Sequence, residues 1–318
     1  MRFLDPMVRL IFVAVILATL LPVTGEARVV AQDISNGAVF LLFLLYGLRL
    51  SRGEVLAGLG NHRLLVPLVI WVFGAMGLAG WALWQVGGGF LPPLLAIGFL
   101  YMGVLPSTVQ SATAYSSLAG GNVATSVVAA ALINILGVFV SAPLYSLLAG
   151  SQGVAFHGEQ LVKVMTMLLL PFAIGQILQS FTRKWVLGHK SLITVMDRGS
   201  IGIAVYVAFS GAVAQGIWTK VDAFGWLWVL VGCALAMVFG YGGAWLLGGL
   251  LRLSKGDRIA MLFAGGQKSV AMGAPLATVL FPAASAGIII LPLVVYHFVQ
   301  MIVAAPIATR LRRFEVPA

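Results

Sequence analysis

The sequence predicts an all-α membrane protein with ten transmembrane helices. Hydrophobic residues make up 61% of the 318 residues and charged residues only 9%, whereas a soluble domain carries about 25% charged residues. Apolar segments of membrane-spanning length recur along the whole chain, and its length suffices for ten spans of about 20 residues. The single cysteine, Cys233, excludes an intramolecular disulfide.

Ten apolar segments account for most of the chain. Each is long enough to cross a bilayer as a helix, and their glycines are typical of closely packed membrane helices. In order, they are expected at Met7–Val23, Val30–Leu50, Leu64–Val86, Leu91–Leu118, Asn122–Leu148, Leu161–Phe181, Leu192–Ile217, Phe224–Leu251, Ile259–Phe281 and Ala284–Leu311.

Basic residues mark alternate gaps between these segments. The clusters are Arg2 and Arg9; Arg49, Arg52 and Arg63; Arg183, Lys184, Lys190 and Arg198; Arg252, Lys255 and Arg258; and Arg310, Arg312 and Arg313. The intervening gaps hold only Arg28, Lys163 and Lys220. The positive-inside rule therefore predicts an inner (plasma) membrane protein with both termini in the cytoplasm. The net charge is +10. The basic residues recur at alternate gaps and form no single stripe, so nucleic-acid binding is not expected.

The first segment has a second interpretation. Arg2 and Arg9 flank a short apolar run, which would also fit a signal peptide. The following residues, Val23–Ala27, match a small-x-small cleavage site poorly, so we expect the first span to be retained.

Two halves with opposite orientation follow from the segment count. Residues 1–150 and 151–318 each hold five segments, of which the fourth is polar and interrupted and the fifth is long. Because five is an odd number, the second half must enter the membrane from the opposite side. Such inverted repeats support alternating access in secondary transporters, and paired interrupted segments indicate their binding site.

The fourth segment is broken at Pro106. A broken helix exposes N–H and C=O groups that hydrocarbon cannot solvate, so such breaks persist in a protein interior or beside a cavity. Free N–H groups favour an anion, and free carbonyls favour a cation. Ser and Thr can instead bond their own i−4 carbonyls, which would carry no function. The candidate binding side chains here are Ser107, Thr108, Gln110, Ser111, Thr113 and Asn122.

The ninth segment carries Lys268 within the run Gly265–Ser269, and Pro275 follows. A cation at bilayer depth costs roughly 2.5–3.5 kcal/mol on insertion scales, so it usually serves a partner, a ligand or a pathway. Gln267, Lys268 and Ser269 are therefore candidate binding residues. Lys268 has the alternative of extending its ammonium to the membrane interface.

Other titratable residues narrow the chemistry. His297 lies within the tenth segment, either as a packed hydrogen-bonding residue or as a proton relay. All nine acidic residues fall in predicted loops or at span ends, so no carboxylate is expected at mid-membrane. The sequence has no Walker loop and no nucleophile–base–acid set, so neither ATP-driven transport nor an enzyme is expected. No organic cofactor is expected either.

Several motifs resemble the bile acid:sodium symporter family, most strongly its SBF-like bacterial branch. The similarity covers essentially the whole chain, and the fourth-segment motif is the most specific part. The matching runs are Tyr46–Leu50, Pro106–Ser111, Ser116–Ala124, Asn134–Phe139, Lys268–Ser269 and Gly273–Ala277.

This resemblance implies that a panel domain moves against a core domain whose fourth and ninth helices are broken and cross. It also implies amphipathic organic anions, such as bile acids or other acidic metabolites, as substrates, moved with sodium. By this resemblance Ser126 joins Ser107, Thr108, Ser111, Thr113, Asn122, Gln267 and Ser269 as a candidate site residue.

The sequence departs from the family at one point. Sodium-coupled members carry a glutamate at the ninth-helix break, where this chain has Phe263–Lys268 and no acid. We therefore hypothesise a secondary, symporter-like transporter of an organic anion, in which Lys268 takes over part of the role of sodium. Two alternatives are a symporter that binds sodium through neutral oxygens alone, and a membrane receptor or regulator that does not transport.

Overall fold

The computed structural model describes residues 6–49, 61–150 and 165–313. These residues form helices joined by turns, without any strand among them, in agreement with the predicted all-α class. Arg2, Arg52 and Lys163, which entered the topology prediction, lie outside the described residues, as does the start of the sixth segment.

Six helices are long and apolar enough to cross a membrane by their length and composition. They are Ala27–Arg49, His62–Gly87, Val123–Ala149, Lys190–Ala214, Ala223–Leu250 and Ala283–Arg312. Shorter apolar helices cover Arg9–Leu20, Pro93–Gly103 and Thr166–Thr182. The chain is therefore an integral membrane protein in composition and fold, whereas the ten-span count stays a prediction.

The expected breaks in the fourth and ninth segments are present. The fourth segment forms α6 (Pro93–Gly103) and α7 (Val109–Leu118), and the ninth forms α15 (Lys255–Gly266) and α16 (Val270–Leu280). Pro106 in the first break has no N–H to continue a helix. In the second break, Gln267 adopts an extended conformation with φ −92° and ψ 155°.

The tenth segment, expected at Ala284–Leu311, consists of two consecutive helices. A turn at Ile290 divides it into α17 (Ala283–Ile289) and α18 (Leu291–Arg313). Pro292 follows at the second position of α18, where a proline's missing N–H costs no intrahelical bond.

The chain forms two compact units, and each takes segments from both halves of the sequence. Unit 1 comprises residues 1–51, 150–222 and 273–290. Unit 2 comprises residues 52–149, 223–272 and 291–318.

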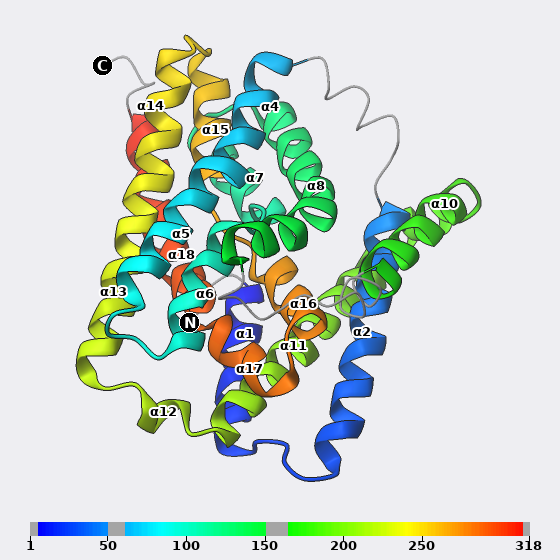
Figure 1. Ribbon diagram of the computed structural model, residues 1–318. Coiled ribbons are helices and arrows are strands. Elements are labelled where there is room, and N and C mark those ends of the chain that lie inside the picture. The colour runs from blue at the N-terminus through cyan, green and yellow to red at the C-terminus, as the bar shows by residue number, and fades with distance from the viewer. Residues whose placement is uncertain (1–5, 50–60, 151–164, 314–318) are drawn as a thin grey trace. The chain divides into compact units, whose positions relative to one another are not determined.

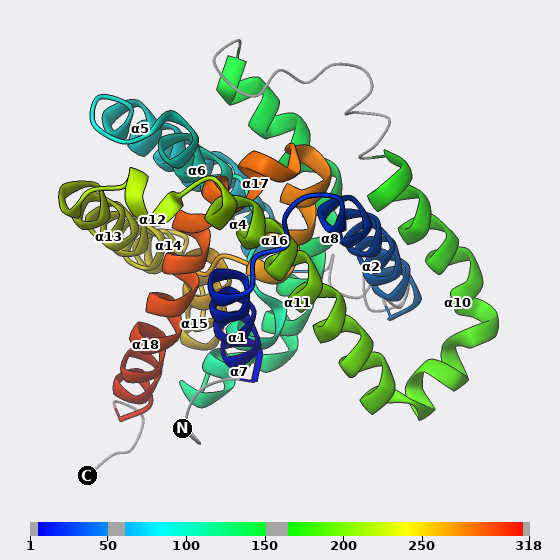
Figure 2. The same ribbon diagram turned by 90° about the horizontal axis from the view of Figure 1, so that it is seen from below.

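Unit 1 is built around helices α2, α10 and α11. Its elements are α1 (Pro6–Leu20), α2 (Ala27–Arg49), η3 (Met165–Leu169), α10 (Leu170–Gly188), α11 (Lys190–Ala214), α12 (Ile217–Lys220), α16 from Gly273 onward, and α17. Helices α2 and α10 lie side by side (Figure 2). They touch at Gly47 and Gly175, where a Cβ on Gly47 would lie 2.9 Å from Gly175 Cα. Glycine at this crossing lets the two backbones approach closely.

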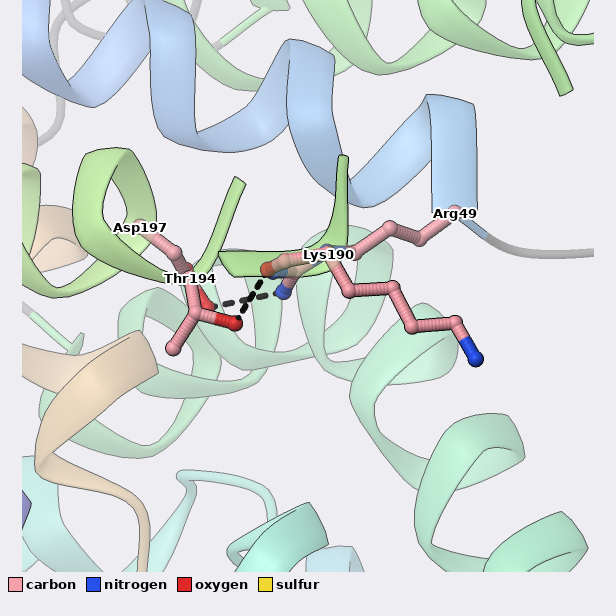
Figure 3. Close-up of polar contacts among 4 residues, drawn as sticks. All are labelled: Arg49, Lys190, Thr194 and Asp197. Carbon is pink, nitrogen blue, oxygen red and sulfur yellow. Dashed lines mark hydrogen bonds and ion pairs between the residues drawn. The ribbon is translucent and has the colours of Figure 1, made fainter. Parts of the chain in front are cut away.

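An ion pair joins α2 to α11 in unit 1. Arg49 Nη1, at the end of α2, lies 2.8 Å from Asp197 Oδ2 (Figure 3). The Lys190 side chain points away from this pair (Figure 3). The sequence placed every acid in a loop or at a span end, but Asp197 is buried within α11. Asp197 can be buried because the Arg49 guanidinium pairs with its carboxylate.

Unit 2 contains both helix breaks. Its elements are α4 (His62–Val69), η1 (Ile70–Ala75), α5 (Met76–Gly87), α6, α7, α8 (Val123–Ala149), α13 (Ala223–Met237), η4 (Val238–Gly242), α14 (Gly243–Leu250), α15, the start of α16, and α18. Figure 1 shows α4 and α5 as parts of one long helix, and likewise α13 and α14. Each of these long helices contains a π-helical turn, η1 or η4.

Aromatic packing joins the two π-helical turns. The Trp71 ring of η1 stacks on Phe239 of η4 with 5.0 Å between ring centroids. Gly243 makes room for Trp71, since a Cβ there would lie 2.1 Å from the indole. The core of unit 2 continues from this contact between α4, α8 and α15, with Leu64, Leu68, Val72, Ala129, Ile133, Ala260 and Ala264 among its buried members.

Candidate binding site at the two helix breaks

The two breaks contact each other inside unit 2. The Ser269 N–H donates to the Pro106 carbonyl at 3.0 Å. Pro106 in turn packs on Gly137 of α8, where an added Cβ would lie 2.6 Å from Pro106 Cγ. Both breaks are therefore held in the interior of this unit, where non-helical backbone requires protein partners.

Every carbonyl of the first break accepts a hydrogen bond, from Gly103 to Ser107. The donors, in chain order of the carbonyls, are Lys268 Nζ, Ser141 Oγ, Lys268 Nζ, the Ser269 amide and Asn134 Nδ2. The structure thus replaces the missing helical bonds with side-chain and backbone donors. This complete pairing is what a buried, unwound segment needs to be stable.

The Lys268 ammonium lies at the centre of this arrangement. Its side chain is fully buried, and Nζ donates to the carbonyls of Gly103 at 2.6 Å, Leu105 at 2.8 Å and Val72 at 3.3 Å. An ammonium has three donors and no acceptor, so three carbonyls match its protonated form. The alternative in which Lys268 extends to the membrane interface is wrong.

The three carbonyls can accept hydrogen bonds from Lys268 because none of them receives the backbone N–H bond that an α-helix would supply. The Met76 N–H would donate to Val72 in an α-helix, but in the π-helical turn it donates to the Trp71 carbonyl. Gly103 ends α6 and Leu105 lies in the break, so neither has a helical partner. The negative end of the α6 dipole also stabilises a cation at this point.

The Lys268 backbone is held by α18. The Lys268 N–H donates to Gln300 Oε1 at 2.8 Å, and Gln300 Nε2 donates to the Lys268 carbonyl at 3.0 Å. His297 Nδ1 lies 2.8 Å from Gln300 Nε2. His297 is therefore a packed hydrogen-bonding residue beside Lys268, and its role as a relay stays a prediction.

Side-chain oxygens from the first break and the start of α7 meet at Gln267, the residue before Lys268. The Ser111 hydroxyl donates to Gln267 Oε1 at 2.6 Å, and the Thr108 hydroxyl also donates to Gln267 Oε1. The interpretation of these hydroxyls as bonded to their own i−4 carbonyls is therefore wrong for Thr108 and Ser111. Within the described residues, the buried Ser107 Oγ makes no hydrogen bond, and the Gln267 side chain also interacts with the Tyr241 hydroxyl.

Comparison with known proteins identifies the family. The sequence profile of the SBF-like CPA transporter family matches residues 5–313. The chain belongs to this family. The resemblance to the bile acid:sodium symporters and their SBF-like branch is thereby confirmed, and the family consists of transporters rather than enzymes.

Named relatives of this transporter come from bacteria and animals. The proposed symporter YfeH of Escherichia coli is 37% identical over 315 residues, which cover 98% of this chain and 94% of YfeH. An uncharacterised Pseudomonas aeruginosa protein is 37% identical over 314 residues, with 98% and 94% covered. The mouse sodium/bile acid cotransporter 7 is 23% identical over 294 residues, with 89% and 84% covered.

Two predicted site residues of this transporter cap helices. Ser269 Oγ accepts the Met272 N–H at 3.2 Å at the start of α16. Asn122 Oδ1 accepts the Thr125 N–H at 3.1 Å at the start of α8, and Asn122 Nδ2 donates to Asp257 Oδ1 at 2.9 Å. Asn122 is exposed, so the structure does not bring it into the group around Gln267.

Three further predicted residues lie apart from Lys268. Gln110 is exposed at the start of α7, Thr113 is half-buried and Ser126 is buried in α8. The Thr113 and Ser126 hydroxyls have no hydrogen-bond partner within the described residues. None of the three is bonded to Lys268 or Gln267.

Sequence reasoning did not single out Gln300, Asn134, Ser141 or Val72, which all contribute to the transporter's site. Gln300 is an amide in an otherwise apolar segment, and Asn134 lies within a quoted family motif, so their polarity was a usable signal. Val72 offered none, because its carbonyl becomes available only through the π-helical turn.

Proposed function

We propose that the protein is a secondary transporter of an organic anion, in which Lys268 is a resident cation that replaces a coupling sodium ion. The observation that carries this proposal is the buried Lys268 ammonium on three carbonyls of unit 2. Substrate would bind beside it and become accessible from the two membrane faces in turn.

The lysine would act on the substrate through charge. All three N–H bonds of the ammonium are directed at carbonyls, so it has no donor left for a ligand. At about 5 Å and an effective dielectric constant near 20, it would still attract an anion by roughly 3 kcal/mol. The Ser107 hydroxyl, which has no hydrogen-bond partner within the described residues, and the side-chain amide of Gln267 are the groups that would donate to a carboxylate.

Uptake by proteoliposomes tests this proposal. We expect a labelled organic anion such as taurocholate to enter without a sodium gradient, and Lys268→Met to abolish uptake while keeping the chain length of the side chain. Lys190→Met, which changes an exposed lysine at the start of α11, should transport normally. Strict sodium dependence that survives Lys268→Met in monodisperse protein would contradict the proposal.

A second candidate function is sodium-coupled symport through neutral oxygens. Thr108 Oγ1, Ser111 Oγ and Gln267 Oε1 meet at one point, and oxygen ligands of this kind suit a hard cation. For this alternative, Thr108→Val should raise the sodium concentration needed for half-maximal uptake, whereas Lys268→Met should not. The reverse pattern supports the resident lysine.

The receptor alternative is weakened by membership in a family of transporters. Counterflow separates the two, because a transporter exchanges a labelled anion against unlabelled anion inside a vesicle. A protein that only binds its ligand gives no accumulation in this assay.

For the membrane arrangement we propose ten spans in two inverted repeats, residues 1–150 and 151–318, with a panel and a core domain. Both termini would lie in the cytoplasm of a cell whose inner (plasma) membrane holds the protein. Cys233 is the only cysteine of the sequence and is buried. A cysteine introduced in place of Glu26 or of Lys255 can therefore be labelled without interference from Cys233. A membrane-impermeant maleimide should label Glu26→Cys in intact cells and Lys255→Cys only after lysis.

A further inference from the structure

A pocket of about 340 Å³ lies at one end of unit 2, where α4 begins and α14 ends. Figure 1 shows both helix ends at the top of the view. The lining has a polar part, His62 and Arg63, and an apolar part, Val66, Pro67 and Leu251. Arg63 Nη2 donates to the Leu251 carbonyl at 3.4 Å, so a cation from α4 reaches the end of α14.

The next residue after Leu251 is Arg252, an exposed cation whose backbone adopts a conformation that L-amino acids rarely adopt. Its φ is 51°, and α14 ends with Arg252 N–H bonded to Gly249 O and Leu253 N–H bonded to Gly248 O. This is the Schellman arrangement, in which glycine normally occupies the position held here by Arg252.

Two exposed apolar ridges begin at this pocket. On the helix formed by α4 and η1, Val66 and Ile70 are 55% and 63% exposed. On α14, Leu246 and Leu250 are 64% and 80% exposed. Each pair has the i, i+4 spacing that places both side chains on one helix face. The two helices touch further along, where Trp71 meets Gly243. The basic residues at this end would attract a phosphate group, and the two rows of exposed apolar side chains would contact two acyl chains.

We propose that this pocket binds an anionic phospholipid. Its phosphate lies between Arg63 and Arg252, beside His62, and its acyl chains follow the two ridges. Arginine suits this role because its planar guanidinium can donate two parallel hydrogen bonds to phosphate. The acid in the following loop, Asp257, is bonded to Asn122 and so competes little for the two arginines. This site is independent of the transport function proposed above.

Lipid binding to the full-length, detergent-purified protein tests the proposal. In native mass spectrometry we expect retention of phosphatidylglycerol over phosphatidylcholine, and Arg63→Gln/Arg252→Gln should lower this preference by about 25-fold, since each juxtamembrane cation contributes about fivefold. The matched control, Lys190→Gln, removes an exposed cation from unit 1 and should keep the preference. Free glycerol phosphate should not displace the lipid, because the ridges hold its acyl chains.

Arg252→Gly separates lipid binding from folding. Glycine removes the backbone strain at this position, so the lipid-free variant should melt at a higher temperature than the parent protein and yet lose about fivefold of its phosphatidylglycerol preference. An unchanged preference in both variants overturns the proposal. So does an equal loss in Lys190→Gln, or displacement of the lipid by glycerol phosphate at equal concentration.

Discussion

The Gln300 side-chain amide pairs with the Lys268 backbone as a second peptide group would. It accepts the Lys268 N–H and donates to the Lys268 carbonyl, with both bonds between 2.8 and 3.0 Å. Both backbone groups of Lys268, its N–H and its carbonyl, are thereby hydrogen-bonded, while its ammonium binds carbonyls of the first break. A single side chain of α18 thus fixes the position of the buried charge.

We expect Gln300→Leu to destabilise the protein by about 2–6 kcal/mol. The leucine fills similar volume but leaves the N–H and C=O of Lys268 without their Gln300 partner, and each buried unsatisfied group costs about 1–3 kcal/mol. Thermal unfolding in detergent measures the loss. Gln85→Leu, at an exposed position of α5, is the control, and an equal effect there would show that Gln300 has no special role.

Gly137→Ala should disturb the first break. The new Cβ would lie 2.6 Å from Pro106 Cγ, which forces the backbone to shift, and such overpacking typically costs about 1–3 kcal/mol. Transport should fall together with stability. Gly199→Ala in α11, where a Cβ meets nothing within 4 Å, should instead be neutral or stabilise the helix by about 0.5–1 kcal/mol. Indistinguishable melting temperatures for the two variants would refute this account.

Lys268→Arg should lose transport even though it keeps the charge. The guanidinium is planar and larger than an ammonium, whereas the three carbonyls surround a single nitrogen at 2.6–3.3 Å. Initial uptake rates at saturating substrate measure the effect. Near-normal uptake by Lys268→Arg would mean that only the charge matters, and not the carbonyl geometry.

The Arg49–Asp197 pair should stabilise unit 1. Arg49→Met leaves the buried Asp197 carboxylate without its partner and should cost about 1–3 kcal/mol, below the 3–5 kcal/mol of a fully buried pair because the Arg49 side chain is 31% exposed. Adding Asp197→Asn should recover part of this loss. A double-mutant cycle from unfolding curves measures the coupling, and additive effects would show that the contact contributes nothing.

Much of this site could be predicted from residue types. Pro106 and the run Gly265–Ser269 indicated the two breaks, and the cost of burying Lys268 indicated an internal partner. The grouping of Thr108, Ser111 and Gln267 was expected from their place in these breaks. Asn122 caps α8 and is exposed, which its closeness in sequence to the break did not indicate, and its role as a site residue stays a prediction.

The sequence by itself determined the apolar segments, the interruptions of the fourth and ninth segments, and the family. Hydropathy and proline act locally, so they can be recognised along a single chain. Only the tertiary structure decided what binds the Lys268 ammonium. Its carbonyl partners lie 163 to 196 positions away in the chain, and the Val72 carbonyl is free only because the adjoining turn is π-helical. Contacts between distant backbone groups depend on packing, and no periodicity of residue types specifies them.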